Sequence, residues 1–331
     1  MKSIFSGLWI WVGGMLVSLG LAYWASLPQS NQGRKNPTQN VDPRSIGSVE
    51  LSLHGVKTLA EREGNKDDRW WISTNASAPS ESSAPDAPLP QSRFLASDKF
   101  TGYLEVLGKL PAQRDLGVIT DGSLGDFGLP NAENWLRIKN AKREIVAEFN
   151  VGKQPYGARS FYVMRTADRK VFLIGSDIID ELLKPEARFF ERNITKMPMQ
   201  SSRKTQILMA GKVKSFVRMT QDDRGVSQWA DEAAPGQVIP AVGAWLEKFF
   251  EIRAAAYADD GVRAKLSELS PTFEVALLDE KGRSEKIEIR SIALNGRTEF
   301  YVASDFLAWP VKVATARVEN LIRDLPPLLQ N

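Results

Sequence analysis

The segment with the strongest chemical signature is "GDFGLP" at residues 125–130, which contains Asp126-Phe127-Gly128. In protein kinases this tripeptide supplies the aspartate that holds magnesium. A kinase site also needs a glycine-rich phosphate loop, a strand lysine and an H-R-D loop, and the sequence has none of these motifs. We interpret the segment as a turn, because glycine permits positive φ angles and Pro130 ends a preceding helix.

Other residues that carry common chemistry are scarce. The chain has no cysteine and one histidine, His54, which follows the alternating run "VELSL" and is predicted to end a strand. Zinc sites usually need several His or Cys ligands, and Ser-His-Asp catalysis needs a positioned imidazole. Three Gly-Lys pairs, at residues 108, 152 and 211, resemble phosphate-loop fragments, but none is followed by Ser or Thr. The sequence therefore predicts no catalytic residue, no cofactor, no metal site and no enzymatic activity.

The composition is that of a globular protein. The 331 residues are 43% hydrophobic and 25% charged, and a chain of this length can form one large domain or two ordinary ones. The net charge is only +3, from 43 basic and 40 acidic residues. Because nucleic-acid binding needs a strong positive field, we expect no nucleic-acid partner.

The N-terminus has the pattern of a membrane anchor. Residues 5–27 carry no charge, and as a helix they would be about 34 Å long, enough to cross the hydrocarbon core. We predict an anchor over residues 1–27 in contact with the lipid bilayer; a cleaved signal peptide is the alternative. Aromatic rings favour the headgroup level, which assigns four residues to the membrane interface: Trp9, Trp11, Tyr23 and Trp24.

The polar residues 28–45 are predicted to form a flexible tether. The short basic N-terminus before a hydrophobic run favours a cytoplasmic N-terminus. We therefore expect a single-pass protein of the bacterial inner membrane with the bulk of the chain in the periplasm.

The sequence repeats itself once after the tether. In "SDKFTGYLEVLGKL" and "IPAVGAWLEKFFEIR" the apolar residues recur at identical spacings, and each set forms one stripe on a helix. The two stripes are Phe100, Tyr103, Leu104, Leu107 and Leu110, and Val242, Trp245, Leu246, Phe249 and Ile252. Three further landmarks keep their order: Phe161-Tyr162-Val163 with Phe300-Tyr301-Val302, Val171 with Val311, and Trp71 with Trp229. The last pair aligns when the Pro- and Ser-rich residues 76–92 are removed as a disordered insertion.

These patterns predict an α+β fold, in which an N-terminal transmembrane helix is followed by two tandem copies of a mixed helix and antiparallel-sheet unit. The first copy covers residues 46–198, including the insertion, and the second, more divergent copy covers residues 199–331. In the segment "ARFFERNITK", basic residues form a stripe beside two phenylalanines on what we expect to be a helix face. Such a stripe is usually a solvated surface. That face is a candidate docking site for an acidic partner, and its residues are Arg188, Phe189, Phe190, Arg192 and Lys196.

Several motifs resemble a bacterial family known only as a domain of unknown function, found near auxiliary components of gliding-motility-type ABC transporters. The matching stretches are "RWWIS", "DKFTGYLEVLGKLPAQR", "DFGLP", "FNVGKQPYGARSFYVMR", "VFLIG" and "FFERNI", between about Val49 and Ile194. The second copy fits the pattern loosely. The resemblance implies a single-pass membrane protein with an extracytoplasmic body, and it carries over no catalytic residue.

The sequence thus favours a membrane-anchored extracytoplasmic scaffold or accessory subunit of an ABC-transporter-linked or motility-linked envelope complex. Its expected partner is a membrane protein complex, such as an ABC permease or a related auxiliary subunit. Two alternatives remain open: a periplasmic binding module for a cell-envelope polymer such as a glycan, and an enzyme of unfamiliar type with two buried carboxylates in a cleft.

Overall fold

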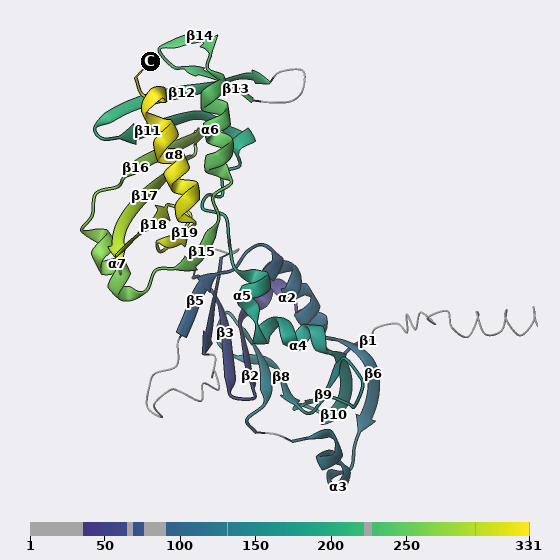
Figure 1. Ribbon diagram of the computed structural model, residues 1–331. Coiled ribbons are helices and arrows are strands. Elements are labelled where there is room, and N and C mark those ends of the chain that lie inside the picture. Colours follow the sequence, from purple (N-terminus) through teal and green to yellow (C-terminus); the bar gives the residue numbers. More distant parts are fainter. Residues whose placement is uncertain are drawn as a thin grey trace, which may run out of the picture.

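The computed structural model describes residues 36–64, 69–75, 91–130, 132–221, 227–294 and 296–330. Each half of the chain forms one antiparallel sheet (Figure 1). The longer helices pack with the main core on one face, and the short helices α3 (Asp121–Leu124) and α7 (Asp260–Ser267) pack against the other face. We call residues 36–189 unit 1 and residues 194–330 unit 2, and the linker between them is Phe190–Asn193.

The described part of unit 1 holds ten strands in the order β1-β6-β10-β9-β8-β7-β2-β3-β4-β5. The strands are β1 (Asn36–Pro37), β2 (Ile46–Leu53), β3 (Val56–Arg62), β4 (Trp70–Asn75), β5 (Gln91–Leu95), β6 (Pro111–Val118), β7 (Trp135–Asn140), β8 (Ile145–Val151), β9 (Ser160–Arg165) and β10 (Lys170–Gly175). The helices are η1 (Pro43–Ser45), α2 (Lys99–Lys109), α3 (Asp121–Leu124), η2 (Gly125–Phe127), α4 (Ser176–Leu183) and α5 (Pro185–Phe189).

The described part of unit 2 holds nine strands in the order β14-β13-β12-β11-β16-β17-β18-β19-β15. They are β11 (Ser202–Met209), β12 (Lys212–Gln221), β13 (Ser227–Asp231), β14 (Ala234–Val238), β15 (Ala254–Tyr257), β16 (Phe273–Asp279), β17 (Ser284–Leu294), β18 (Arg297–Ser304) and β19 (Val311–Val313). The helices are η3 (Met199–Ser201), α6 (Pro240–Phe250), α7 (Asp260–Ser267) and α8 (Thr315–Leu328).

The two sheets have the same topology. If β1 is set aside, β2 to β10 take the same places in the first sheet as β11 to β19 take in the second. The helices also follow the same strands: α2 and α6 come after the fourth strand, α3 and α7 after the fifth, and α4 and α8 after the last. The chain therefore contains one antiparallel module twice.

The expected α+β class with a transmembrane helix is wrong, because the described chain is mostly β. The sequence patterns underestimated the strands, since edge strands bury few side chains and show no clear alternation. In β6 only Ala112 is buried, and β14 is exposed along its whole length. No helix within the described ranges is long and apolar enough to span a membrane. Residues 1–35, with the predicted anchor and its aromatic residues Trp9, Trp11, Tyr23 and Trp24, lie outside the described residues.

The two predicted helix stripes are confirmed, and each lies in the core of its own unit. All ten apolar residues of the stripes are at most 4% exposed. Each stripe also reaches the closing helix through one buried hydrogen bond. The Tyr103 hydroxyl donates to the carbonyl of Ile178 in α4, and Trp245 Nε1 donates to the carbonyl of Leu321 in α8 at 3.1 Å. The same helix-to-helix contact is thus made by different side chains.

The F-Y-V tripeptides lie at equivalent places in β9 and β18, with the phenylalanine and valine in the main core of each unit. The predicted match of Val171 with Val311 is wrong by one residue. Val311 pairs with Val302 as Phe172 pairs with Val163. A slip of one residue reverses the face of the sheet, and Val171 accordingly packs in a small cluster under α3.

The predicted match of Trp71 with Trp229 is also wrong by one residue. Trp70 and Trp229 each pair with an arginine of the neighbouring strand, Arg62 and Arg218, and both indoles are fully buried in the cores. The Trp70 carbonyl accepts a hydrogen bond from Ala96 N, just after β5, and the Trp229 carbonyl accepts one from Ile239 N, just after β14. Trp70 is therefore the counterpart of Trp229, and Trp71 faces the opposite side of the sheet.

Two predicted boundaries differ from the structure. Residues 36–45, expected within the flexible tether, are held against α2: the Thr38 hydroxyl donates to the Leu110 carbonyl at 2.9 Å, and Val41 N donates to the Gly108 carbonyl at 2.9 Å. Gln91 and Ser92, expected in the disordered insertion, belong to β5. The rest of the insertion, residues 76–90, lies outside the described residues.

Candidate functional site

The linker joins the two sheets through backbone hydrogen bonds. Ser97 N donates to the Phe189 carbonyl at 2.7 Å, and Glu191 N donates to the Leu95 carbonyl at 2.9 Å, so the linker pairs with the end of β5. Ala254 N then donates to the carbonyl of Arg192 at 2.8 Å, which pairs the linker with the start of β15. β5 and β15 are edge strands of their sheets. We call this region, where the linker holds the two edges together, the joint (Figure 1).

Aromatic rings from both units close the joint. The Trp71 ring of unit 1 lies 4.6 Å from the Trp309 ring of unit 2 and 5.9 Å from the Tyr257 ring. Tyr257 also contacts Phe190 of the linker at 5.8 Å, and burial raises the pKa of its hydroxyl. Because such pairs add about 0.5–1.5 kcal/mol each beyond the area they bury, the cluster fixes one unit against the other.

Two guanidinium groups extend this cluster. Arg93 of β5 lies over the rings of Trp71 and Trp309, at 5.3 and 5.1 Å from their centroids. Arg263 of α7 lies over Trp309 at 4.5 Å and pairs with Asp260. The Trp309 ring therefore contacts groups from both units, and cation–π contacts add to the stability of the joint.

A groove of about 1150 Å³ opens beside the joint. Its floor is the helix-free face of β2 to β5. In this part of the sheet one row of side chains, Val49, Ala60, Ile72 and Phe94, enters the core, and the alternate row, Glu50, Leu59, Ser73 and Arg93, faces the groove. Its wall is β15 with the start of α7 and Trp309. We call this space the joint groove.

The edge of β5 contributes free backbone groups to the joint groove. Phe94 lies opposite Ile72, and Ala96 N donates to the Trp70 carbonyl at 2.8 Å, so even-numbered residues of β5 bond to β4. In an antiparallel pair the backbone groups alternate in direction, and the N–H and C=O of Arg93 therefore point away from β4. Within the described ranges, no backbone group bonds to Arg93 on that side.

The charges around the joint groove are mixed and partly paired. Glu50 on the floor pairs with Lys139, and Asp260 on the wall pairs with Arg263. Lys57, Arg93 and Asp259 are exposed. The groove therefore has no single sign of charge, which suits a polypeptide segment better than a polyanion.

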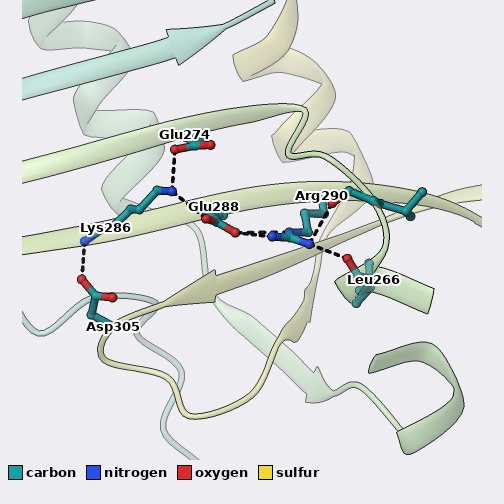
Figure 2. A network of polar contacts seen from close by, with 7 residues as sticks. Leu266, Glu274, Lys286, Glu288, Arg290 and Asp305 are labelled. Atoms are coloured by element: carbon teal, nitrogen blue, oxygen red, sulfur yellow. Dashed lines mark hydrogen bonds and ion pairs between the residues drawn. The ribbon is translucent and has the colours of Figure 1, made fainter. Parts of the chain in front are cut away.

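The outer face of unit 2 carries a polar network that supports α7 (Figure 2). Lys286 pairs with Glu274 and Glu288, at 2.8 Å each, and Glu288 also pairs with Arg290 at 2.6 Å. Burial alone would raise the pKa of Glu288, but the hydrogen bonds from Lys286 and Arg290 together with their charges outweigh it and lower that pKa. Arg290 donates to the carbonyl of Leu266 at the end of α7. The network thus holds in place the helix that forms the wall of the groove.

The predicted docking residues do not share one face. Phe189 is fully buried among Phe100 and Tyr103. Phe190 is half-buried in the joint, and Arg192 lies over its ring at 5.5 Å. Arg188 is exposed on α5 and pairs with Glu181, while Lys196 lines a different cavity. Helix α5 ends at Phe189, so the expected helical stripe does not form.

The kinase-like tripeptide lies in the turn between α3 and β7. Phe127 packs edge-to-face on Tyr162 at 4.8 Å, its carbonyl accepts a hydrogen bond from Lys153 N at 2.9 Å, and Gly128 has a φ of +69°. Asp126 is exposed. Across the described residues there is no group of three or more His, Cys, Asp or Glu side chains placed to hold a metal ion.

The other sequence candidates also have structural places. His54 and Gly55 form the two-residue turn between β2 and β3, with φ angles of 52° and 80°, and Gly211 has the same position between β11 and β12. Gly108 and Gly152 lie where a Cβ atom would collide with the carbonyls of Val41 and Phe127. The Gly-Lys pairs are therefore explained by backbone geometry.

Sequence reasoning missed the residues that make the joint, above all Arg93, Tyr257 and Trp309. Each lies outside a periodic pattern, and their contacts cross from one unit to the other. The one available signal was the doublet Trp70-Trp71, because neighbouring residues of a strand face opposite sides and both could not enter one core.

A family model described as "Domain of unknown function (DUF4340)" matches residues 95–268, which is more than half of the chain. The matched range begins at the end of β5, contains the whole linker and ends with α7, so it contains much of the joint. No curated protein matches the chain.

Proposed function

This chain belongs to the DUF4340 family, and from that premise we propose that it is a scaffold that binds an extended segment of a partner protein in the joint groove. The observation that carries the proposal is the open edge of β5 along a groove that both units form. An exposed strand edge offers unpaired backbone donors and acceptors, and a partner segment can bind there as an added strand.

Strand addition would make use of the contacts that hold the joint together. The linker already adds to the end of β5, with Glu191 N bonded to the Leu95 carbonyl. A partner segment would continue this pairing toward Arg93, with its side chains between the floor of the groove and the wall around Trp309. Because the aromatic cluster fixes the wall before binding, less ordering is needed when the segment enters.

A glycan ligand is the second candidate, and the groove favours it less. A sugar would stack on an open ring face, whereas the half-buried Trp309 ring already contacts Arg93, Arg263, Trp71 and Tyr257. Trp135 lines the groove, with Arg137 over its ring at 4.0 Å. These rings therefore serve packing within the protein.

The proposal also covers which protein binds in the groove and in which compartment it does so. The resemblance of the sequence motifs to proteins found near gliding-motility-type transporters motivates a partner among ABC permeases or their auxiliary subunits. The uncharged residues 5–27 motivate attachment of the body to the bacterial inner membrane, with the groove in the periplasm. Transporter genes beside this gene and protection of a C-terminal tag in spheroplasts would support these two points.

Site-specific photo-crosslinking in cells tests the binding mode. A photo-reactive residue at Ser73, on the floor of the groove, should crosslink to a defined partner protein. The same residue at Ala244, an exposed position on α6, serves as the matched control and should not. Equal crosslinking from both positions, or none from Ser73, would contradict a partner in the groove.

A pair of variants distinguishes binding through the backbone of β5 from binding through the Arg93 side chain. Arg93→Pro removes the outward N–H but no bond to β4, because proline is tolerated on an edge strand, and it should abolish the crosslink from Ser73. Arg93→Ala removes only the guanidinium and should keep most of it. Loss of the crosslink in Arg93→Ala alone would favour side-chain recognition over strand addition.

A further inference from the structure

A second cavity, of about 590 Å³, lies at the joint and shares no lining residue with the joint groove. It is formed by the end of β5, the linker with the residues after it, the start of β17 and the loop after β18. Two of its lining residues, Glu191 and Glu285, are each only 7% exposed. We call this cavity the carboxylate pocket.

Glu285 has one oxygen with partners and one without. Its Oε2 accepts hydrogen bonds from the Thr195 hydroxyl at 2.7 Å and from Met197 N at 3.3 Å. Its Oε1 is fully buried and has no hydrogen-bond partner in the described chain. A buried carboxylate oxygen without a partner costs about 1–3 kcal/mol or more, so the Glu285 carboxylate is incompletely satisfied within the protein.

The Glu191 carboxylate is bonded by the linker residues that follow it. Its Oε1 accepts a hydrogen bond from Asn193 N at 2.8 Å. Burial raises the pKa of Glu191 and also that of Glu285. Nearby carboxylates act in the same direction, Asp98 on Glu191 and Asp305 on Glu285.

The basic groups of the pocket are mostly engaged elsewhere. Arg69 pairs with Glu63, and its Nη2 donates to the Phe306 carbonyl at 2.7 Å, while its buried Nε makes no hydrogen bond in the described chain. Arg283 pairs with Asp279 at 2.6 Å. Lys196 is exposed at the rim, and no hydrogen bond or ion pair of its ammonium is found in the described ranges. Four carboxylates thus line the cavity, from the segment after β5, the linker, the start of β17 and the loop after β18: Asp98, Glu191, Glu285 and Asp305.

We propose that the carboxylate pocket binds a protonated primary amine, with the ammonium held between the carboxylates of Glu285 and Glu191. An ammonium carries three donors and no acceptor, and charge-assisted hydrogen bonds to a carboxylate are about twice as strong as neutral ones. The cavity volume lies in the range of small-ligand sites, and it accommodates a lysine side chain of a partner or a free alkylamine. This inference does not depend on the joint groove, because the two cavities are separate.

Calorimetric titration of the full chain tests it with matched probes. At pH 8, acetyl-Gly-Lys-Gly-amide should bind, and acetyl-Gly-norleucine-Gly-amide, which lacks the charge, should not. Butylammonium chloride distinguishes the two sources: binding as tight as that of the lysine peptide assigns a free amine, and weaker binding assigns a peptide lysine. At pH 5 binding should weaken, because protonated carboxyl groups no longer attract the cation.

Variants place the binding in the pocket. Glu285→Gln keeps the shape of the side chain and should weaken binding of the lysine peptide at least tenfold, while Asp98→Asn at the rim should weaken it about twofold. Glu274→Gln, on the opposite face of the same sheet, should leave it unchanged. Equal binding of the norleucine peptide, unchanged binding by Glu285→Gln, or no heat with the lysine peptide up to 20 mM would each overturn the proposal.

Discussion

In unit 1 the edge strand β5 lines the joint groove, whereas its counterpart in unit 2, β14, lies at the far end of the molecule and is exposed along its whole length (Figure 1). β14 contains Pro235 and Gly236, residues that weaken pairing at an edge. β5, "QSRFL", contains neither. Strand pairing is thus disfavoured at β14, the edge that faces solvent, and remains possible at β5, the edge at the joint.

The interiors of the two units differ much less. The helix stripes, the strand order and the hydrogen bond from the first helix to the last occur in both. A core accepts different apolar side chains if volume and pattern are kept. Tyr103 and Trp245 can therefore occupy equivalent places, and each donates a hydrogen bond to the last helix of its unit. Because the interiors are alike and the edges differ, function should be sought at the edges and the joint.

The largest expected effect concerns the two core tryptophans. Trp70→Ala and Trp229→Ala should each lower the free energy of unfolding by about 3–5 kcal/mol, because both remove a fully buried indole. Urea denaturation of the full chain, followed by circular dichroism, measures this. Costs that differ by more than about 2 kcal/mol would break the equivalence of the two positions.

A smaller effect is expected for the hydrogen bond between helices. Tyr103→Phe leaves the Ile178 carbonyl without its donor and should cost about 1–2 kcal/mol in unfolding free energy. Tyr156→Phe, at a fully exposed tyrosine, is the control and should cost nothing measurable. If both variants unfold like the parent protein, the bond is not a shared element of the module.

The buried carboxylates should make stability depend on pH. Burial raises the pKa of Glu191 and Glu285 in the folded protein, so the folded state binds more protons than the unfolded state just above the ordinary glutamate pKa. The loss of stability caused by burying these two ionised carboxylates is therefore absent at lower pH and appears as pH rises through the raised pKa values. Glu285→Gln should therefore stabilise the protein at pH 8, by about 1 kcal/mol, and change little at pH 4. Melting curves across this range measure it, and a lower melting temperature of the variant at pH 8 would contradict the assignment.

The smallest stability changes are expected in the turns that follow the fifth strand of each unit, and they should differ between the two units. In unit 2, Asp259 caps α7 by accepting a hydrogen bond from Val262 N at 2.8 Å, so Asp259→Ala should cost about 1 kcal/mol. In unit 1, Asp126→Ala should change stability by less than about 0.5 kcal/mol, because its side chain is exposed. Thermal melts of both variants compare the turns directly, and a larger loss in Asp126→Ala would restore a role for that carboxylate.

Part of the fold could be predicted because it depends on local periodicity. The stripes of α2 and α6 and the repeated F-Y-V strands were visible as spacings, and their side chains lie in the cores. The sheets could not be predicted in full, because polar strands such as β6 and β14 are defined by partners distant in sequence. The registers of Trp71 and Val171 failed for the same reason, since one residue decides the face of a strand.

The sequence by itself determined the composition of the cores, the helix stripes and the recurrence of one module, because these depend on the order of apolar and polar residues along the chain. Only the tertiary structure decided where the open edge of β5 lies and which side chains meet across the joint. Arg93 and Trp309 become neighbours when the linker folds the two sheets together. Contacts between residues so far apart in sequence leave no periodic trace, so the groove and the carboxylate pocket follow from packing alone.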